Sequence, residues 1–353
     1  MSKLRIGFLS TAHIGKKNWK AIFNSGNCVV SAVASRSHEK GREFVEQCQR
    51  EFAFETRPAH FGSYEEMISS RDVDAIYIPL PTGLRKEWVL RAAGAGKHVL
   101  CEKPCAINLA ELEEMLAACR QNRVQFLDGV MFMHNVRLPK MREVLDDGAS
   151  IGQIQRISSN FSFYLGEEFF RKNIRADGAL EPAGCLGDLG WYSIRFILWT
   201  LKWQQPRELA ARILAQSASG APTEFSAELI FDGGVSASFY CSFLAARRQT
   251  ITVGGRNGWL HMPDFVHPRN GYEPSFEVNE KPITVSGGEK CPPGADPMGY
   301  GHPTAQDTRM WRHFANQIFS DKLNGDWPMW ARQTQSVLDA CLEAGRTRKV
   351  VQL

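Results

Sequence analysis

The sequence predicts two kinds of fold in one chain. An α/β part with a doubly wound parallel sheet comes first, and an α+β part follows, with a predominantly antiparallel, open-faced sheet and helices on one face. Over the first 125 residues, short apolar runs without polar alternation are separated by helical patterns. After about residue 150, runs that alternate apolar and polar side chains dominate. A length of 353 residues is enough for two such domains.

Five strands and four helices are predicted in the first part of the chain. The strands cover residues 4–9, 29–34, 73–78, 98–100 and 124–127, and the helices cover residues 14–25, 37–51, 86–94 and 109–121. Apolar strands that alternate with helices are typical of a parallel sheet covered on both faces. We therefore predict that residues 1–125 form a Rossmann domain that binds a dinucleotide.

Residues 126–353 are predicted to form the substrate-binding and oligomerisation domain, with a C-terminal helix that is a candidate to pack back on the first domain. A face of its sheet carrying Phe239 and Phe243 is the expected interface of a homodimer or homotetramer. Residues 263–303 are rich in Pro and Gly and are predicted as one long irregular loop. The predicted strands are residues 153–163, 208–215, 224–231, 235–243, 249–253 and 259–262, and the predicted helices are residues 186–201, 304–319 and 330–346.

Composition excludes several classes of protein. The 42 Lys and Arg against 38 Asp and Glu give a net charge of +4 without basic clusters, which argues against nucleic acid and membrane partners. No apolar run approaches the roughly 18 residues of a membrane helix, and the N-terminal apolar stretch is too short for a signal peptide, so a cytoplasmic protein is expected. The nine cysteines include no CxxC pair and complete no zinc set, so we expect no metal and no disulfide scaffold.

A small-residue turn between the first strand and the first helix is the predicted pyrophosphate site. The spacing Ser10-x-Ala12-x-x-Gly15 takes the place of the usual G-x-G-x-x-G, with the next smallest side chains at two of the three positions. Such turns also occur for packing alone, but its position in an α/β half favours cofactor binding. The residues expected to contact the cofactor here are Ser10, Thr11, Ala12, His13 and Ile14.

The end of the second predicted strand indicates which dinucleotide binds. NAD-binding domains place an acidic residue there for the ribose 2′-hydroxyl, whereas this chain has Ser35 and Arg36 and no acid before Glu39. A serine hydroxyl and a guanidinium can both bind a 2′-phosphate, so NADP is favoured over NAD. The alternative is a solvated arginine at a strand end.

A Glu-Lys-Pro sequence follows the strand predicted at residues 98–100, at the edge where open α/β sheets bind ligands. The stretch Ala95 to Pro104, A-G-K-H-V-L-C-E-K-P, resembles the signature of the Gfo/Idh/MocA oxidoreductases, which include glucose–fructose oxidoreductase and dimeric dihydrodiol dehydrogenase. Residues 79–88 resemble the family's segment under the nicotinamide, and residues 184–192 resemble its second catalytic segment. The resemblance implies a Rossmann half and a sheet domain that presents the substrate pocket.

The resemblance also implies roles for single residues. Lys103 matches the lysine that contacts substrate and cofactor, Asp188 matches the aspartate that positions the sugar, and Tyr192 takes the place of the acid/base, where many members have histidine. Oxidation of a carbinol requires a base for the hydroxyl proton. A tyrosine, with an ordinary pKa of about 10, requires a nearby ammonium such as that of Lys103 to lower it. Asp188 and Tyr192 are four apart and share one face of a helix.

Other predicted site residues come from the same matched segments. Many relatives carry His at the position of Arg85, which indicates a more cationic pocket here, and Asp128 occupies the place of the family's acid. Lys103, Asp128, Arg175, Asp188 and Tyr192 are the predicted substrate-binding residues. The remaining predicted cofactor contacts are Pro79, Leu80, Pro81, Leu84, Arg85, Glu102 and Lys103.

The prediction for function is an NADP-dependent oxidoreductase that transfers hydride between nicotinamide and a carbinol or carbonyl carbon. A sugar, a cyclitol or a trans-dihydrodiol is the expected small-molecule substrate. Two alternatives stay open at this point. One is a redox-neutral enzyme that catalyses hydrolysis or elimination with a tightly bound nicotinamide cofactor, and the other is a non-catalytic NADP-binding sensor or scaffold.

Overall fold

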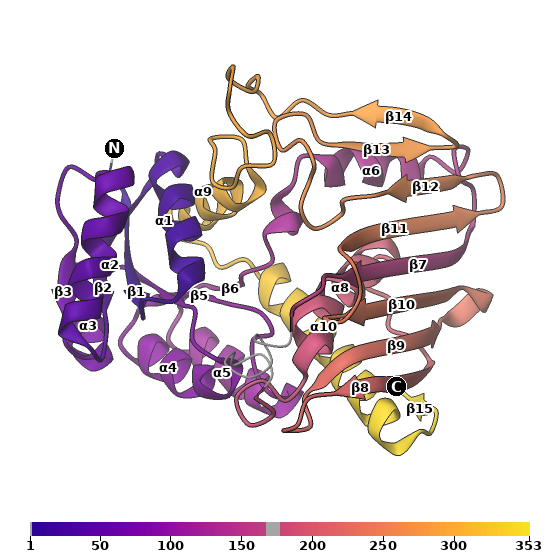
Figure 1. Ribbon diagram of the computed structural model, residues 1–353, viewed down its shortest axis with the longest axis horizontal. Coiled ribbons are helices and arrows are strands. Elements are labelled where there is room, and N and C mark those ends of the chain that lie inside the picture. The colour runs from indigo at the N-terminus through magenta and orange to yellow at the C-terminus, as the bar shows by residue number, and fades with distance from the viewer. Residues whose placement is uncertain (1, 167–176) are drawn as a thin grey trace. The chain divides into compact units, whose positions relative to one another are not determined.

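The computed structural model describes residues 2–166 and 177–353, which pack as two compact units (Figure 1). The first unit comprises Met1–Cys105, Ala110–Asn135 and Gly287–Met329. The second comprises Ala106–Leu109, Val136–Ser286 and Trp330–Leu353. The assignment of residues 1–125 to the cofactor and of residues 126–353 to substrate binding and oligomerisation stays a prediction.

The first unit contains a six-stranded parallel sheet in the order β3-β2-β1-β4-β5-β6. The order reverses between β1 and β4, as it does in doubly wound dinucleotide-binding sheets, so the predicted fold of this half is confirmed. Strand β3 was not predicted because its three residues, A-H-F, are only partly buried and form no apolar run. The strands are β1 (Leu4–Leu9), β2 (Cys28–Ala34), β3 (Ala59–Phe61), β4 (Ala75–Ile78), β5 (His98–Cys101) and β6 (Phe126–Asp128).

Helices cover both faces of this sheet, which explains why its strands lack polar alternation. On one side of β1 the Phe8 ring meets the Trp19 ring of α1 edge-on, with centroids 6.2 Å apart. On the other side, a Cβ added to Gly7 would lie 3.0 Å from Met67 of α3, so α3 packs closely on the strand there. The helices are α1 (His13–Ser25), α2 (His38–Glu51), α3 (Tyr64–Ser69), α4 (Thr82–Gly94), α5 (Leu109–Gln121), the short η1 (Met131–His134) and α9 (Gln306–Phe319), which packs on α1.

The second unit contains a nine-stranded sheet in the order β14-β13-β12-β11-β7-β10-β9-β8-β15. Neighbouring strands are antiparallel except β7 and β10, which run parallel, so the predominantly antiparallel sheet predicted for this part is confirmed. The strands are β7 (Ile154–Ser162), β8 (Glu208–Gln216), β9 (Pro222–Ile230), β10 (Ser236–Ser242), β11 (Arg248–Gly255), β12 (Trp259–Met262), β13 (Ser275–Val278), β14 (Lys281–Thr284) and β15 (Val351–Gln352).

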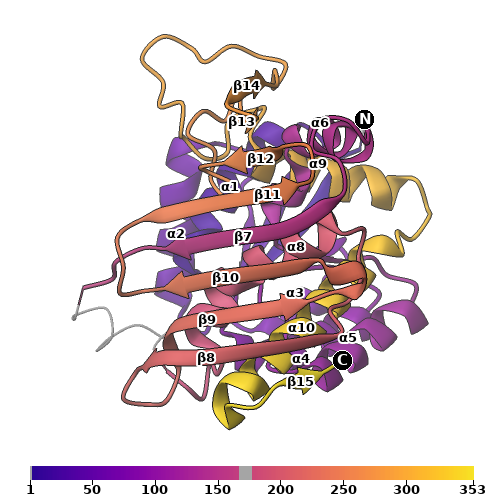
Figure 2. The same ribbon diagram turned by 90° about the vertical axis from the view of Figure 1, so that its right-hand side faces the viewer.

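Helices of this unit cover one face of the sheet, and Figure 2 shows the other face toward the viewer. A Cβ on Gly190 would lie 3.4 Å from Phe239, and one on Gly345 would lie 2.9 Å from Phe225. Phe239 and Phe243 are 1% and 0% exposed. Their predicted place on the open face is therefore wrong, because the strand's alternation turns Phe239 toward the helices. The unit's helical segments are α6 (Arg137–Asp146), the π-helical η3 (Leu186–Gly190), α8 (Trp191–Thr200), the turn η4 (Asp232–Gly234) and α10 (Asp326–Thr347).

The open face of this sheet is polar. Ser158 of β7 pairs with Thr252 of β11 on one side and with Ser238 of β10 on the other. The Arg156 guanidinium donates to a Glu228 carboxylate oxygen at 3.0 Å and to the Ser238 hydroxyl at 2.8 Å. In the described part of the chain, no helix combines the length and the hydropathy needed to cross a membrane.

The segment predicted as one irregular loop, residues 263–303, contains the hairpin β13–β14, so this prediction is wrong in part. Its turn is formed by Asn279 and Glu280, with φ angles of 48° and 67°. Two consecutive positive φ angles are typical of the tight turn of a hairpin, where glycine usually marks the sequence. Without a glycine and with strands of four residues, the hairpin left no clear signal.

Candidate cofactor and catalytic site

The cofactor and substrate residues predicted in the first unit lie at one edge of the parallel sheet. Ser10 follows β1, Ser35 follows β2, Pro79 follows β4, Glu102 follows β5, and Asp128 ends β6. Carboxyl ends of parallel strands meet at the same edge, where open α/β sheets bind ligands. The fold therefore brings these groups to one side of the unit.

The turn after β1 contains a residue in a glycine-like backbone conformation. Ser10 has a φ of 102°, a backbone conformation that favours glycine, and its Oγ accepts a hydrogen bond from the N–H of Ala12 at 3.3 Å. Helix α1 begins at His13 and has no side-chain cap hydrogen bond at its N-terminus. A Cβ on Gly15 would lie 3.0 Å from the Phe44 ring, so α1 packs closely there. Thr11 is half-buried, and the side chains of His13 and Ile14 are exposed.

The turn after β2 presents a serine and an arginine. Ser35 is buried, and its hydroxyl accepts a hydrogen bond from the N–H of Ser37 at 3.3 Å. Arg36 is exposed and lies beside the Tyr64 hydroxyl. Burial raises the pKa of Tyr64, and the neighbouring Arg36 opposes that shift.

The Glu102 carboxylate ends a chain of buried hydrogen bonds. Oη of Tyr77 donates to Oε1 of Glu102 at 2.6 Å, Nδ2 of Asn18 donates to Oη of Tyr77 at 2.8 Å, and Nε1 of Trp311 donates to Oδ1 of Asn18 at 2.7 Å. Burial and the neighbouring Glu102 carboxylate raise the pKa of Tyr77 well above its ordinary value. A Cβ on Gly129 would lie 2.9 Å from Oε2 of Glu102, so the carboxylate needs glycine at that position.

Tyr77 and Asn18 were not among the predicted site residues. The available signal was a hydroxyl within the apolar run Ala75–Ile78 and an amide within the buried face of α1. From the sequence alone, each is interpreted as a core residue, because its hydrogen-bond partners lie far away in the chain.

Lys103 is half-buried, and the peptide bond between Lys103 and Pro104 is cis. The guanidinium of Arg85, in the first turn of α4, is directed at the main chain around this lysine. Nε of Arg85 donates to the carbonyl of Leu80 at 2.7 Å, and Nη1 donates to the carbonyls of Glu102, at 2.9 Å, and of Pro104. Among its neighbours, Leu84 is 43% exposed and Pro81 is the N-cap residue of α4.

A second ammonium, not predicted, lies at the same edge. Nζ of Lys17 is 3.8 Å from Oδ2 of Asp307 and 3.9 Å from the centroid of the Tyr300 ring. Burial lowers the pKa of Lys17, while the charges of Asp307 and Glu102 oppose that shift. No sequence pattern marked this lysine, because Asp307 lies 290 residues further along the chain.

In the second unit, Asp188 and Tyr192 lie on consecutive helical turns. Asp188 is half-buried within η3, and Tyr192, 6% exposed, lies in the first turn of α8. The Tyr192 ring meets the Phe161 ring of β7 edge-on, with centroids 5.7 Å apart. Arg175 lies outside the described residues. The catalytic and substrate-binding roles of these residues stay predictions.

The residues at the carboxyl edge fit a dinucleotide. An α-helix N-terminus without a side-chain cap, preceded by a glycine-like turn at Ser10, provides N–H groups for a pyrophosphate. Ser35 and Arg36 supply the hydroxyl and guanidinium donors that a 2′-phosphate accepts. In the described part of the chain, no group of three or more His, Cys, Asp or Glu could hold a metal ion.

Two family models match the chain. The oxidoreductase family with an NAD-binding Rossmann fold, GFO/IDH/MocA, matches residues 4–129. The GFO/IDH/MocA C-terminal domain matches residues 138–261.

Among curated proteins, the chain is similar to dehydrogenases and reductases. It is 31% identical to a trans-1,2-dihydrobenzene-1,2-diol dehydrogenase of Bos taurus over 67% of this chain and 66% of that protein. It is 28% identical to a D-xylose 1-dehydrogenase (NADP(+)) of Haloferax volcanii, over 80% of this chain and 83% of that protein. It is 31% identical to a dTDP-3,4-didehydro-2,6-dideoxy-alpha-D-glucose 3-reductase of Streptomyces violaceoruber, over 79% and 78% of the two chains.

Solved structures share the fold. A 3-ketoreductase from Actinomadura kijaniata, in complex with NADP and TDP-benzene, superposes with a TM-score of 0.82 at 24% identity, over 97% of this chain and 98% of that chain. An aldose-aldose oxidoreductase from Caulobacter crescentus, complexed with glycerol, gives a TM-score of 0.82 at 22% identity, over 99% and 100% of the two chains.

Proposed function

Because the chain belongs to the Gfo/Idh/MocA family of oxidoreductases, we propose that it is an NADP-dependent dehydrogenase or reductase of a small carbinol substrate. A sugar, a cyclitol or a trans-dihydrodiol is the proposed substrate class. The observation that carries the proposal is the set of groups after β1, β2, β4 and β5, which includes Lys103 at the carboxyl end of β5. The names of the dihydrodiol and xylose dehydrogenases support the substrate class.

NADP rather than NAD is the proposed cofactor. Ser35 and Arg36 would bind its 2′-phosphate, and no carboxylate stands at either position to repel it. Main-chain N–H groups of residues 10–14 would bind the pyrophosphate. Pro79, Leu80, Pro81, Leu84 and Glu102 would surround the nicotinamide. When bound, the cofactor supplies the acceptor or donor of the hydride.

Three side chains would handle the proton and the substrate. In the oxidation, the Tyr192 phenolate takes the proton of the substrate hydroxyl while the carbon–hydrogen bond breaks and the carbonyl forms. The Lys103 ammonium favours the charged form of the phenol and stabilises negative charge on the reacting oxygen. Asp188 orients the substrate hydroxyl and Tyr192. Asp128 and Arg175 would hold the rest of the substrate. In the reduction, Tyr192 returns the proton.

A direct test is to incubate the purified protein with D-xylose, myo-inositol and trans-1,2-dihydrobenzene-1,2-diol, each with NADP⁺ and with NAD⁺, and to follow nicotinamide absorbance. We expect turnover of at least one alcohol, with a higher kcat/KM for NADP⁺. A clear preference for NAD⁺ would contradict the role of Ser35 and Arg36. Nicotinamide retained through purification, with no turnover of added NADP⁺, would instead support a redox-neutral reaction.

Two variants test the proposed role of Tyr192 as the acid/base. Tyr192→Phe removes the proton carrier and should lower kcat by about 10²- to 10⁴-fold while the KM for NADP⁺ changes little. Phe161→Leu is a matched control, because it changes the ring that packs on Tyr192 but removes no ionisable group. A kcat of Tyr192→Phe within threefold of the wild type would rule out this role.

We propose that two or four copies of the chain assemble through the open face of the nine-stranded sheet. Ser158, Ser238 and Thr252 place small side chains side by side at the middle of this face, which favours close approach of a second sheet there. Ser158→Arg should shift the mass measured by light scattering to that of a monomer. A wild-type monomer would refute assembly. We also propose a cytoplasmic location, because a reducing compartment would keep its nine free cysteines reduced.

A further inference from the structure

Arg85 has an unusual environment for a charged side chain beside a ligand site. It is 5% exposed, in the first turn of α4. Within the described residues, its hydrogen bonds all end on main-chain oxygens: those of Leu80, Glu102 and Pro104. A buried guanidinium requires several acceptors, and here the backbone supplies them.

The three carbonyls belong to two loops that Arg85 ties together. Leu80 lies in the loop after β4, and Glu102 and Pro104 lie directly before and after Lys103. The Lys103 peptide unit is therefore held on both sides by the same guanidinium, through Nη1. The Thr82 hydroxyl lies 3.5 Å from the Pro104 carbonyl and is directed at the same point.

A second contact fixes the residue before Lys103 independently. The Glu102 carboxylate accepts from the Tyr77 hydroxyl at 2.6 Å, so its side chain and its carbonyl are held by different residues. Arg85 holds the carbonyls of the residues before and after Lys103. These hydrogen bonds restrict rotation of the backbone at Lys103 and therefore fix the orientation of its side chain.

We propose that Arg85 is a positioning residue for Lys103, which acts through the main chain rather than by touching the cofactor. It rests on the proposed function, since it presumes that the Lys103 ammonium acts in the reaction. Lysine cannot replace it fully, because an ammonium on a flexible stem lacks the planar, branched donors that reach Leu80, Glu102 and Pro104 together. Histidine, with two ring nitrogens at most as donors, reaches fewer carbonyls still.

The test compares Arg85→Met and Arg85→Lys with the wild type and with Lys86→Met. Lys86 follows Arg85 in the same helix and pairs with Glu114 at the surface, at 2.9 Å, so its loss controls for a changed charge on α4. The first measurement is the rate of Lys103 acylation by acetic anhydride from pH 6 to 10, quantified by mass spectrometry with Lys97 as internal reference. The second is kcat and KM with D-xylose or the dihydrodiol, and the third is NADPH affinity by fluorescence.

For Arg85→Met we expect the acylation rate of Lys103 relative to Lys97 to change by about threefold or more, because the ammonium leaves its fixed surroundings. We expect kcat to fall by about 10²-fold, as for a catalytic group displaced by an ångström, with a much smaller change in KM. Arg85→Lys should lie between Arg85→Met and the wild type, and Lys86→Met should match the wild type.

Unchanged acylation of Lys103 in folded Arg85→Lys and Arg85→Met would overturn the proposal. So would weaker NADPH binding with unchanged acylation, because that result assigns Arg85 to direct contact with the cofactor. If Arg85→Met does not fold, Arg85→Lys alone decides between these outcomes. Absence of wild-type turnover would count against the proposed function only, since the acylation rates still report on the positioning of Lys103.

Discussion

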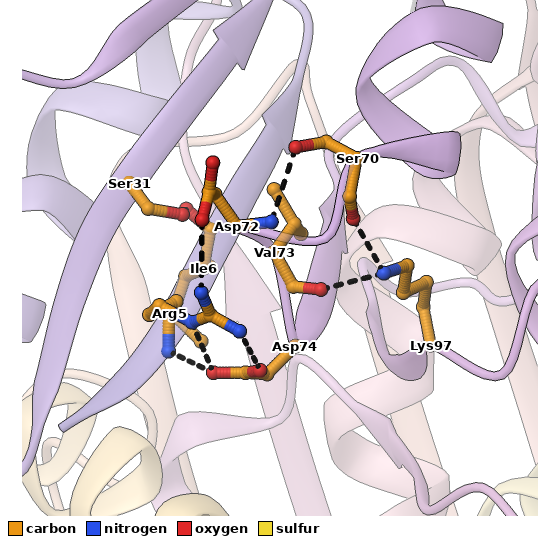
Figure 3. A network of polar contacts seen from close by, with 8 residues as sticks. All are labelled: Arg5, Ile6, Ser31, Ser70, Asp72, Val73, Asp74 and Lys97. Atoms are coloured by element: carbon orange, nitrogen blue, oxygen red, sulfur yellow. Dashed lines mark hydrogen bonds and ion pairs between the residues drawn. The ribbon is translucent and has the colours of Figure 1, made fainter. Parts of the chain in front are cut away.

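The two edges of the six-stranded parallel sheet both carry charged side chains, but they use them differently. At the amino edge, charged groups pair with one another or with loop carbonyls (Figure 3). Nη2 of Arg5 lies 2.8 Å from Oδ1 of Asp74, and Nε and the N–H of Arg5 both donate to Oδ2. Nζ of Lys97 donates to the carbonyls of Ser70 and Val73, at 2.7 Å each.

At the carboxyl edge, the charged groups proposed to act on ligands are supported from behind by buried residues. Lys103 lies in a loop whose carbonyls, on Glu102 and Pro104, accept hydrogen bonds from Arg85. The Glu102 carboxylate accepts a hydrogen bond from the hydroxyl of buried Tyr77. Arg36 is exposed beyond the end of β2. The contrast indicates that charged groups stabilise the strands at one edge, whereas buried residues support the groups proposed to bind ligands at the other.

Two lysines flank the same strand, and their substitution gives the largest expected difference in kcat. Lys97 precedes β5 and Lys103 follows it. We expect Lys103→Met to lower kcat by about 10³-fold while NADPH binding stays largely intact. Lys97→Met should leave kcat within twofold and cost about 1 kcal/mol of unfolding free energy, since two hydrogen bonds to carbonyls are lost. Steady-state kinetics and urea unfolding measure both quantities, and equal losses of kcat would remove the distinction between the edges.

The second prediction concerns cofactor discrimination at the carboxyl edge. Arg36→Ala should raise the KM for NADPH by about 10- to 100-fold, the effect of losing a charge-assisted hydrogen bond to a phosphate, and should leave the KM for NADH unchanged. Arg42→Ala, in the exposed face of α2, is the control. An equal rise of both KM values would show that Arg36 does not contact a 2′-phosphate.

The third prediction compares the stability cost of removing a buried tyrosine hydroxyl with that of removing a half-buried one. Tyr77→Phe leaves the Asn18 amide and a Glu102 carboxylate oxygen without the hydroxyl between them, and should cost about 1–3 kcal/mol of unfolding free energy. Tyr240→Phe is the matched variant, because this half-buried tyrosine donates to Glu224 on the open sheet face. Its expected cost is below about 1 kcal/mol. Urea unfolding of both variants measures the two losses of unfolding free energy. Equal losses would show that the hydrogen bonds from Trp311 to Glu102 do not stabilise the fold.

The smallest expected effect is a pH dependence at the amino edge. Burial raises the pKa of Asp74, but the hydrogen bonds and charge of Arg5 outweigh it, so the pKa lies below its ordinary value of 3.8. A depressed pKa contributes stability above the ordinary value, which is lost as the pH falls through the folded-state pKa. Wild type should therefore exceed Asp74→Asn in stability at pH 7, by about 1 kcal/mol or less for a pair this exposed, and the two should converge below pH 4.

Unfolding curves of the wild type and Asp74→Asn at pH 3, 5 and 7 measure this convergence. Asp72→Asn is the control, because its carboxylate lies at the surface, 3.2 Å from Arg5, and shows far less burial. A wild-type advantage that stays constant from pH 7 to pH 3 would contradict the assigned pairing.

Local sequence was enough to predict much of the first unit. Strand β1 has the predicted bounds of residues 4–9, because five apolar or small residues interrupted by a single arginine favour a buried strand. The strand β12 likewise has the predicted bounds of residues 259–262. The hairpin β13–β14 was missed because its turn uses Asn279 and Glu280 at positive φ, where sequence patterns rely on glycine.

The sequence by itself determined most of the longer strands and helices, the turn at Ser10 and the Glu-Lys-Pro segment, because apolar periodicity and turn chemistry act between near neighbours in the chain. Only the tertiary structure decided which face of β10 the helices cover, and therefore where Phe239 points. It also decided which groups accept the hydrogen bonds of Arg85. The acceptors are the main-chain carbonyls of Leu80, Glu102 and Pro104, and every residue has such a carbonyl, so the sequence cannot single them out. They come together around one guanidinium only when β4 and β5 pair.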